Sequence, residues 1–143
     1  MKVRKRKETK RNEGGQSLVE LALTFMVLML LLSVAVDLGR LFLSYIAVRE
    51  AAQEGALYGS TNPEDIVEIE QRVRTSSSTP VDLADTSAVS VSQSAPGGRC
   101  AGNTLSVSVL YHFQLTMPLV SAIIGDEYDL SLTASSTILR PEC

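Results

Sequence analysis

The feature that most constrains this chain is an uninterrupted apolar run near its N-terminus. Leu21 to Val36 are sixteen consecutive uncharged residues, nearly all of them apolar. As a helix the run rises only ~24 Å, less than a ~30 Å hydrocarbon core, but residues 16–20 and 37–41 extend it to spanning length. A core helix of a water-soluble domain is apolar on one face rather than on all faces. The run therefore predicts a transmembrane helix over about residues 18–41.

Charge is distributed unequally on the two sides of this run. Residues 1–15 hold seven Lys or Arg and two Glu, a net charge of +5. Of the 13 basic and 16 acidic residues in the chain, six and fourteen remain in residues 16–143, a net charge of −8. Basic residues beside an apolar segment stay on the cytoplasmic side. We therefore expect a single pass through the inner (cytoplasmic) membrane, with the N-terminus cytoplasmic and the C-terminal domain extracytoplasmic.

The same basic residues have an alternative interpretation as a nucleic-acid-binding arm. They lack interleaved aromatic residues and adjoin the apolar run, so the membrane interpretation is favoured. We expect membrane lipids, and no nucleic acid, among the partners of this chain.

The helical pattern continues past the apolar run to about Tyr58 without a proline. From Asp37 onward it becomes amphipathic, and Asp37 and Arg40 are spaced to form an ion pair at the membrane boundary. The expected apolar stripe comprises Leu38, Leu41, Tyr45, Val48, Ala52 and Ala56, with Arg40, Ser44, Glu50 and Glu54 on other faces.

Small and capping residues mark the end of this helix and the start of another. Ala51, Gly55 and Gly59 recur at every fourth position, which permits close approach of a second helix, although helix termination is the favoured role of Gly59. Asn62 is the expected N-cap and Pro63 the first residue of a short second helix. The apolar face of this helix comprises Ile66, Ile69 and Val73.

Beyond residue 80 the apolar period changes from 3.6 to 2, which is the period of half-buried strands. Alternation covers three stretches, Val89–Ser92, Leu105–Leu115 and Leu130–Ile138. Three such strands most simply form an antiparallel meander covered by the outer half of the long helix. The apolar connection Pro118–Gly125 is expected to contain a helical turn. The predicted fold is α+β, with a basic leader (1–15), a long N-terminal helix (16–60) and an extracytoplasmic domain (61–143).

Few residues indicate catalysis or metal binding. His112 is the only histidine and is interpreted as an exposed strand residue, so we expect no enzymatic activity, no cofactor and no metal site. Asp126, Glu127 and Asp129 could bind Ca²⁺, but they are too few for an EF-hand loop of about 12 residues. A solvated turn is the favoured interpretation of these three, and calcium binding stays open.

The two cysteines both lie on the predicted outer side of the membrane, where a disulfide can persist. Cys100 precedes the central strand and Cys143 follows the last strand. The start of one strand lies beside the end of the next in an antiparallel meander, so these positions can approach within bridging distance. We predict a Cys100–Cys143 disulfide, with two free thiols or an intermolecular bridge as alternatives.

Four motifs distinguish the N-terminal region. They are Gly15, Val19-Glu20-Leu21-Ala22-Leu23, Asp37-Leu38-Gly39-Arg40 and Ala51-Ala52-Gln53-Glu54-Gly55-Ala56. With these motifs the region resembles TadE-like proteins, minor pilins (pseudopilins) of tight-adherence (Flp-type) type IV pili. The chain departs from the family at Met26, where proline is frequent, at Asp37, where Glu is frequent, and at Gln53, where Arg is common. These departures leave the subfamily open.

The resemblance implies cleavage by a prepilin peptidase between Gly15 and Gln16, so that Glu20 becomes the fifth residue of the mature chain. It implies a type IV pilin-like form of the α+β fold and a role in pilus assembly, surface adhesion or secretion. It also implies other pilins and pilus assembly platform proteins as partners. The residues agree with this: glycine lets the backbone extend into a protease cleft, and a charge in lipid is costly unless paired. We expect Glu20 to pair with the Gln16 amino group of a neighbouring subunit, with a place in the headgroup layer as the alternative.

Two other classes of protein fit the same N-terminus. A secretory signal peptide could be cut after Ser33-Val34-Ala35, which would release a soluble domain that starts at Val36. An uncleaved single-pass anchor could instead carry an extracytoplasmic binding domain. The first residue of the mature protein distinguishes the three: Gln16, Val36 or a residue near Met1.

Overall fold

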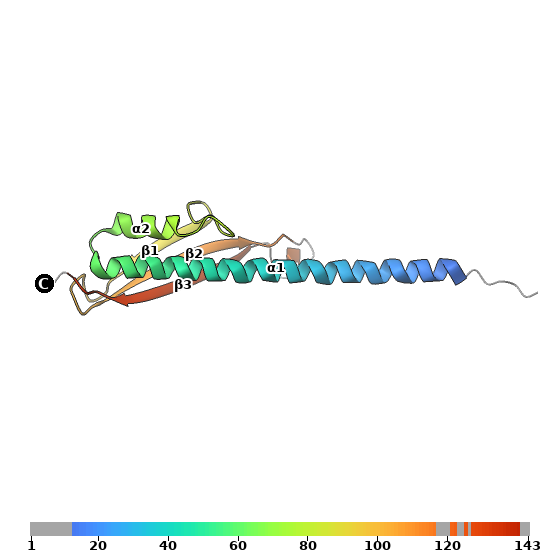
Figure 1. The fold of residues 1–143 in the computed structure, drawn as a ribbon, viewed down its shortest axis with the longest axis horizontal. Helices are drawn as coiled ribbons and strands as arrows, with labels where there is room; N and C mark the ends of the chain where they lie inside the picture. Colours follow the sequence, from blue (N-terminus) through green and yellow to red (C-terminus); the bar gives the residue numbers. More distant parts are fainter. Residues whose placement is uncertain (1–12, 117–120, 123–124, 126, 141–143) are drawn as a thin grey trace, which may run out of the picture.

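The computed structural model describes residues 13–116, 121–122, 125 and 127–140. Its elements are α1 (Glu13–Thr61), α2 (Ile66–Thr75), β1 (Val89–Ser94), β2 (Thr104–Gln114) and β3 (Glu127–Thr137). The second half of α1 lies along the sheet with α2 beside it, and the first half projects alone (Figure 1). The predicted α+β fold, with a long apolar helix, a short second helix and a three-stranded antiparallel sheet, is confirmed.

Helix α1 runs for 49 residues, which corresponds to about 73 Å at the usual rise per residue. It begins at Glu13, three residues before the expected start at Gln16, so Gly14 and Gly15 belong to its first turns. Glycine costs only about 1 kcal/mol in a helix relative to alanine and therefore does not by itself stop one. Residues 1–12 of the predicted leader lie outside the described residues.

The sheet is an antiparallel meander in the order β1-β2-β3. Val109 of β2 pairs with Val91 of β1 and with Leu132 of β3. Odd-numbered residues of β2 face α1 and are largely buried, whereas even-numbered residues face away and are more exposed. On the outer face, hydroxyl pairs link β2 to β3, as between Ser108 and Thr133, whose oxygen atoms are 2.7 Å apart. The predicted alternation is confirmed.

The hydrophobic core lies between the inner face of the sheet, α1 and α2. Its fully buried side chains include Val48, Ile69, Val73, Leu105, Val107, Val109 and Ile138. Burying a side chain of this kind contributes roughly 1.5–3 kcal/mol. Helix α2 contributes Ile69 and Val73, as predicted, whereas Ile66 of the predicted face is exposed.

The face that α1 turns toward the sheet differs from the predicted stripe. Ser44, expected outside it, is buried with 3% exposure, whereas Leu38 and Tyr45 are 60% and 39% exposed. Val48, Ala52 and Ala56 of the predicted stripe are buried, which confirms that part of the prediction. Ala47 and Ala51, which the stripe did not include, are buried as well, because close contact between a helix and a sheet selects small side chains.

Gly55 and Gly59 allow neighbouring elements to approach α1 closely. A Cβ atom at Gly55 would lie 2.5 Å from a methyl group of Val73 on α2, and one at Gly59 would lie 2.2 Å from a methyl group of Leu105 on β2. The predicted close approach of another helix is therefore confirmed at Gly55. The predicted termination at Gly59 is wrong, because α1 continues to Thr61.

Helix α2 is capped by Asp65, whose side chain accepts a hydrogen bond of 3.1 Å from the backbone N–H of Glu68. The predicted N-cap at Asn62 and helix start at Pro63 are wrong, and Pro63 lies in the turn between the helices. The reason is that the Asn62 N–H still donates to the carbonyl of Tyr58 and so completes the last turn of α1.

A short turn led by Asp85 precedes β1. The Asp85 carboxylate accepts hydrogen bonds from the Ser87 hydroxyl at 2.6 Å and from the Ser87 N–H at 2.9 Å. These bonds, the hydroxyl first, lower the pKa of Asp85 below its ordinary value. The Asp85 carbonyl also accepts from the Val89 N–H at 3.0 Å, so this turn fixes the start of β1.

Part of the connection between β2 and β3 is described. Ser121 and Ala122 are helical, in agreement with the expected helical turn. Asp126 lies outside the described residues. Glu127 and Asp129 belong to β3, so their interpretation as turn residues is wrong: the strand begins three residues earlier than its apolar alternation.

Candidate functional site

The predicted processing site lies in the N-terminal turns of α1. Gly15 is exposed, and a Cβ atom added to it would meet no other atom within 4 Å. Gln16 and Glu20 are exposed and lie four residues apart, so their side chains project from the same side of the helix. The first four N–H groups of a helix have no acceptor within it, so the turns around Gly15 unwind most easily. Gly15, Gln16 and Glu20 thus occupy one accessible end of α1.

The first half of α1 presents apolar side chains in all directions. No residue of its most apolar 18-residue window is buried within the described structure. Leu18, Phe25 and Leu31 are 57–67% exposed, although such side chains are normally buried in a protein that folds in water. Glu20 is the only charged residue between Leu18 and Val36. This helix fits a single-pass membrane anchor.

A charged and aromatic cluster marks the place where α1 reaches the sheet. Asp37 is 6% exposed, and its carboxylate lies 3.5 Å from the guanidinium of Arg40, which confirms the predicted ion pair. The Arg40 guanidinium also donates to the hydroxyl of Thr116 and lies 5.7 Å from the centre of the Phe113 ring, within the range of a cation–π interaction. Arg40 therefore connects the outer end of the apolar segment to the end of β2.

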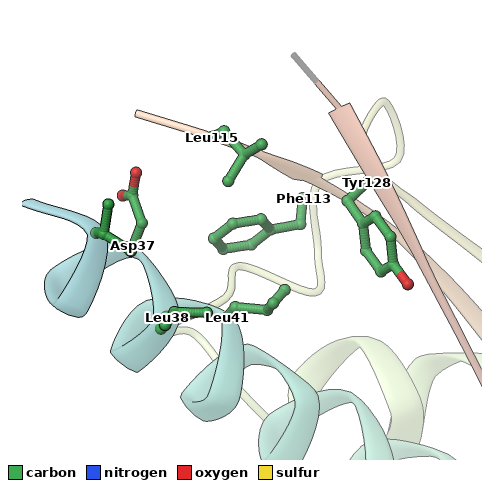
Figure 2. A pocket seen from close by; sticks show the side chains of 7 residues that line it. Asp37, Leu38, Leu41, Phe113, Leu115 and Tyr128 are labelled. Atoms are coloured by element: carbon green, nitrogen blue, oxygen red, sulfur yellow. The ribbon is translucent and has the colours of Figure 1, made fainter. Parts of the chain in front are cut away.

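An apolar cavity of about 150 Å³ adjoins this cluster (Figure 2). Its lining comprises Val34, Asp37, Leu38, Leu41, Phe113, Leu115 and Tyr128, of which only Asp37 is charged. Helix α1 supplies one wall and the ends of β2 and β3 the other. The end of the sheet nearest the anchor thus turns an apolar surface toward α1.

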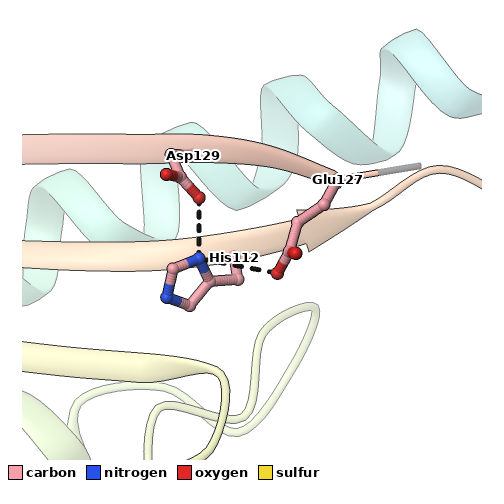
Figure 3. A group of neighbouring side chains, drawn as sticks. All are labelled: His112, Glu127 and Asp129. Atoms are coloured by element: carbon pink, nitrogen blue, oxygen red, sulfur yellow. Dashed lines mark hydrogen bonds and ion pairs between the residues drawn. The ribbon is translucent and has the colours of Figure 1, made fainter. Parts of the chain in front are cut away.

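On the opposite face of the same sheet end, three polar side chains come together (Figure 3). The Nδ1 atom of His112 lies 2.7 Å from Oδ1 of Asp129 and 3.5 Å from Oε1 of Glu127. His112 and Asp129 are direct partners in the register of β2 and β3. This contact is not visible in the sequence, because period-2 alternation shows which residues of one strand share a face but not which residues of two strands are paired.

Cys100 is disulfide-bonded. Its predicted partner, Cys143, lies outside the described residues, so the pairing stays a prediction. The described chain supports it: the Gly102 N–H donates to the carbonyl of Ile138 at 2.8 Å, and the Ile138 N–H donates to that of Asn103 at 2.8 Å. The C-terminal segment therefore runs beside the loop that contains Cys100.

The fold and the exposed helix define a class of protein. It is a pilin-like α+β protein in which the first half of one long helix fits a membrane anchor and the second half supports a β-sheet. Residues 15–57 match the family model described as TadE-like protein, which confirms the resemblance of the N-terminal region to that family. The match begins at Gly15 and ends within α1. Comparisons with curated proteins and with solved structures gave no match.

The TadE-like family suggests a protein associated with the tight-adherence (Tad) pilus. It is a structural family rather than a family of enzymes. The family match suggests association with pilus components, and the exposed apolar helix fits a membrane anchor.

Proposed function

We propose that this protein is a minor pilin of a tight-adherence type IV pilus, cleaved after Gly15 by a prepilin peptidase. The observation that carries the proposal is the family match, which begins at Gly15 and covers an exposed apolar helix with Glu20 as its one early charge. The basic residues before Gly15 favour a cytoplasmic N-terminus. Partners under this proposal are the peptidase, other pilins and the pilus assembly platform.

Cleavage changes the electrostatics of the N-terminal turns. It leaves a positive amino group on Gln16, one helical turn from the Glu20 carboxylate. Each charge is costly in lipid when it is alone. In a bundle of parallel helices, the amino group of one subunit can pair with Glu20 of a neighbour, which neutralises both charges. The apolar side chains on every side of α1 would supply the remaining contacts between packed helices.

The continuity of α1 also supports retention of the anchor. A signal-peptide cut after Ala35 would fall two residues before Asp37, in the middle of the helix. It would remove Val34 from the wall of the cavity and place a new amino terminus beside the Asp37–Arg40 ion pair. A cut after Gly15 leaves all of these contacts in place.

The proposal is tested by N-terminal sequencing and intact-mass analysis of the protein from its own membranes. Wild-type protein should begin at Gln16, and Gly15→Leu should retain the leader. Gly39→Leu is the matched control, because Gly39 lies in the same helix and likewise has no atom within 4 Å of an added Cβ. It should be processed normally. A Gly15→Leu protein that still begins at Gln16, or a wild-type protein that begins at Val36 or near Met1, would contradict the proposal.

A further inference from the structure

We propose that His112, Glu127 and Asp129 form a binding site for one divalent transition-metal ion of the Zn²⁺ type on the outer face of the sheet. The site does not depend on peptidase cleavage or on pilus assembly. It rests on the pairing of β2 with β3 and on the positions of three side chains that can ligate a metal (Figure 3).

The backbone places these side chains. The register pairs His112 with Asp129 and Gln114 with Glu127. Side chains of directly paired residues project to the same face of a sheet, with Cβ atoms ~4.5–5.5 Å apart, and residues two apart on one strand share that face. The intervening Phe113 is 2% exposed and packs toward α1, so the polar set faces away from the core. The ligand set is therefore held by strand pairing rather than by a flexible loop.

The ligand atoms are already close to metal-binding distances. The three candidate atoms all lie within 4.8 Å of one another, and both carboxylates converge on Nδ1 of His112, at 2.7 and 3.5 Å. Zinc bonds of ~2.0–2.2 Å in a tetrahedral site separate ligand atoms by about 3.3 Å. The Asp129 oxygen would move away from His112 by about 0.6 Å, and the widest of the three separations, at most 4.8 Å, would close by up to about 1.5 Å. The side chains of Asp129 and Glu127 are 61% and 55% exposed, which leaves room for these movements.

The chemistry of the ligands selects the ion. An imidazole nitrogen with two carboxylate oxygens suits Zn²⁺ and its neighbours in the first transition row, whereas Ca²⁺ and Mg²⁺ prefer oxygen ligands alone. Within the described residues, His112 is the only ion-pair partner of Glu127 and Asp129, and no Lys or Arg forms an ion pair with either carboxylate. A divalent ion would neutralise both negative charges. The ion would take the place of the hydrogen bond between His112 Nδ1 and the Asp129 carboxylate.

The position of the site suggests what the ion would do. His112 is near the end of β2 and Glu127 begins β3, so one ion would clamp the two strands on either side of their connection. The neighbouring residues Phe113 and Tyr128 line the cavity beside α1, which places the clamp at the end of the sheet nearest the anchor. With three protein ligands, the remaining coordination position would face solvent.

The test uses the full chain without an affinity tag, in detergent micelles and with its disulfide oxidised. Because His112 is the only histidine, ¹⁵N-histidine labelling reports this ring alone. Titration with ZnCl₂ should shift the Nδ1 resonance, leave the proton on Nε2, and saturate at one ion per chain with micromolar affinity. Calcium chloride should not reproduce this shift.

Isothermal titration calorimetry of variants completes the test. Zn²⁺ binding should weaken at least about tenfold in each of three variants, His112→Ala, Asp129→Asn and Glu127→Gln. Loss of a residue that only hydrogen-bonds to a metal ligand already weakens metal affinity by about that factor, so loss of a ligand should cost at least as much. Glu54→Gln, which alters an exposed carboxylate on α1, is the matched control and should bind as wild type. Circular dichroism confirms that each variant is folded. Absence of a saturable shift in the wild-type histidine, or 1:1 binding that survives both His112→Ala and Asp129→Asn, would overturn the proposal.

Discussion

Replacing Gly55 with alanine tests how closely α2 packs on α1. The new Cβ atom would lie 2.5 Å from Cγ2 of Val73 and 3.3 Å from Cγ1 of Val107, whereas carbon atoms in contact are normally ~3.5–4.0 Å apart. A valine in a helix has one strongly preferred rotamer, so Val73 cannot swing aside and α2 must shift. Overpacking of this kind costs ~1–3 kcal/mol, while the better helix propensity of alanine returns ~1 kcal/mol. Because Val73 is rigid, the overpacking cost should lie in the upper part of its range, about 2–3 kcal/mol, which leaves a net loss of stability of about 1–2 kcal/mol.

The assay is urea unfolding of the full chain in detergent micelles, followed by near-UV circular dichroism of its four tyrosines, since the chain has no tryptophan. Gly39→Ala is the control: a Cβ there meets nothing within 4 Å, so this variant should lose no stability. Adding Val73→Ala to Gly55→Ala removes the clashing methyl group, so the double variant should be less destabilised than the sum of the single variants. A Gly55→Ala protein as stable as wild type, or strictly additive effects in the double variant, would refute the proposed clash.

Three further predictions concern charge and covalent structure. Glu20→Ala should leave cleavage and membrane insertion intact but reduce incorporation into pili, because its partner charge would be left unpaired at a cost of roughly 3–5 kcal/mol. Incorporation is measured in pili sheared from cells, with Glu54→Ala as the control. Normal incorporation of the Glu20→Ala protein would contradict the pairing. The Cys100–Cys143 bridge would close a loop of 44 residues and contribute on the order of 4 kcal/mol; two alkylatable thiols in unreduced protein, measured by intact mass, would disprove it. The pKa of Asp85 is lower in the folded state than in the unfolded chain. Its ionised carboxylate therefore stabilises the fold at pH values above the unfolded-state pKa, and this stabilisation is lost as the pH falls through the folded-state pKa. Asp85→Asn should therefore lower the melting temperature at pH 7 more than at pH 3, and an equal decrease at both pH values would count against this role.

The sequence predicted the elements of the sheet because a strand's alternation can be read from its own residues. Val89–Ser92 lies on β1, and the stretch predicted as Leu105–Leu115 lies on β2 up to Gln114, with the inner and outer faces as expected. The pairing of strands could not be read in this way. The contact between His112 and Asp129 depends on a register set by the turns and the core, and a shift of one residue would have placed them on opposite faces.

The helices show a second limit of sequence-based prediction. The ion pair of Asp37 and Arg40 was predicted correctly because it depends only on local helical spacing. The buried face of α1 was predicted incorrectly at Leu38 and Ser44, because burial there depends on how near the sheet lies. The prediction at Gly59 failed for the same reason. A glycine that makes room for a neighbouring side chain cannot be distinguished in the sequence from a glycine that ends a helix.

If the first half of α1 spans a membrane, as we propose, the Asp37–Arg40 pair limits how deeply the helix inserts, and this depth bears on the role of Glu20. This pair and its contact with Thr116 belong with the polar part of the molecule, so they favour a place for Asp37 at the outer edge of the hydrocarbon core. Along the helix, Gln16 then lies about 32 Å from Asp37, close to the ~30 Å thickness of the core, and Glu20 lies about 26 Å away. The Glu20 carboxylate would thus sit a few ångströms inside the inner edge of the core, and a typical ~20° tilt would place it slightly deeper. At that depth the Glu20 side chain would have to extend outward to reach the headgroup layer. The Gln16 amino group of a neighbouring subunit would be closer. The depth of the anchor therefore favours pairing of Glu20 with that amino group.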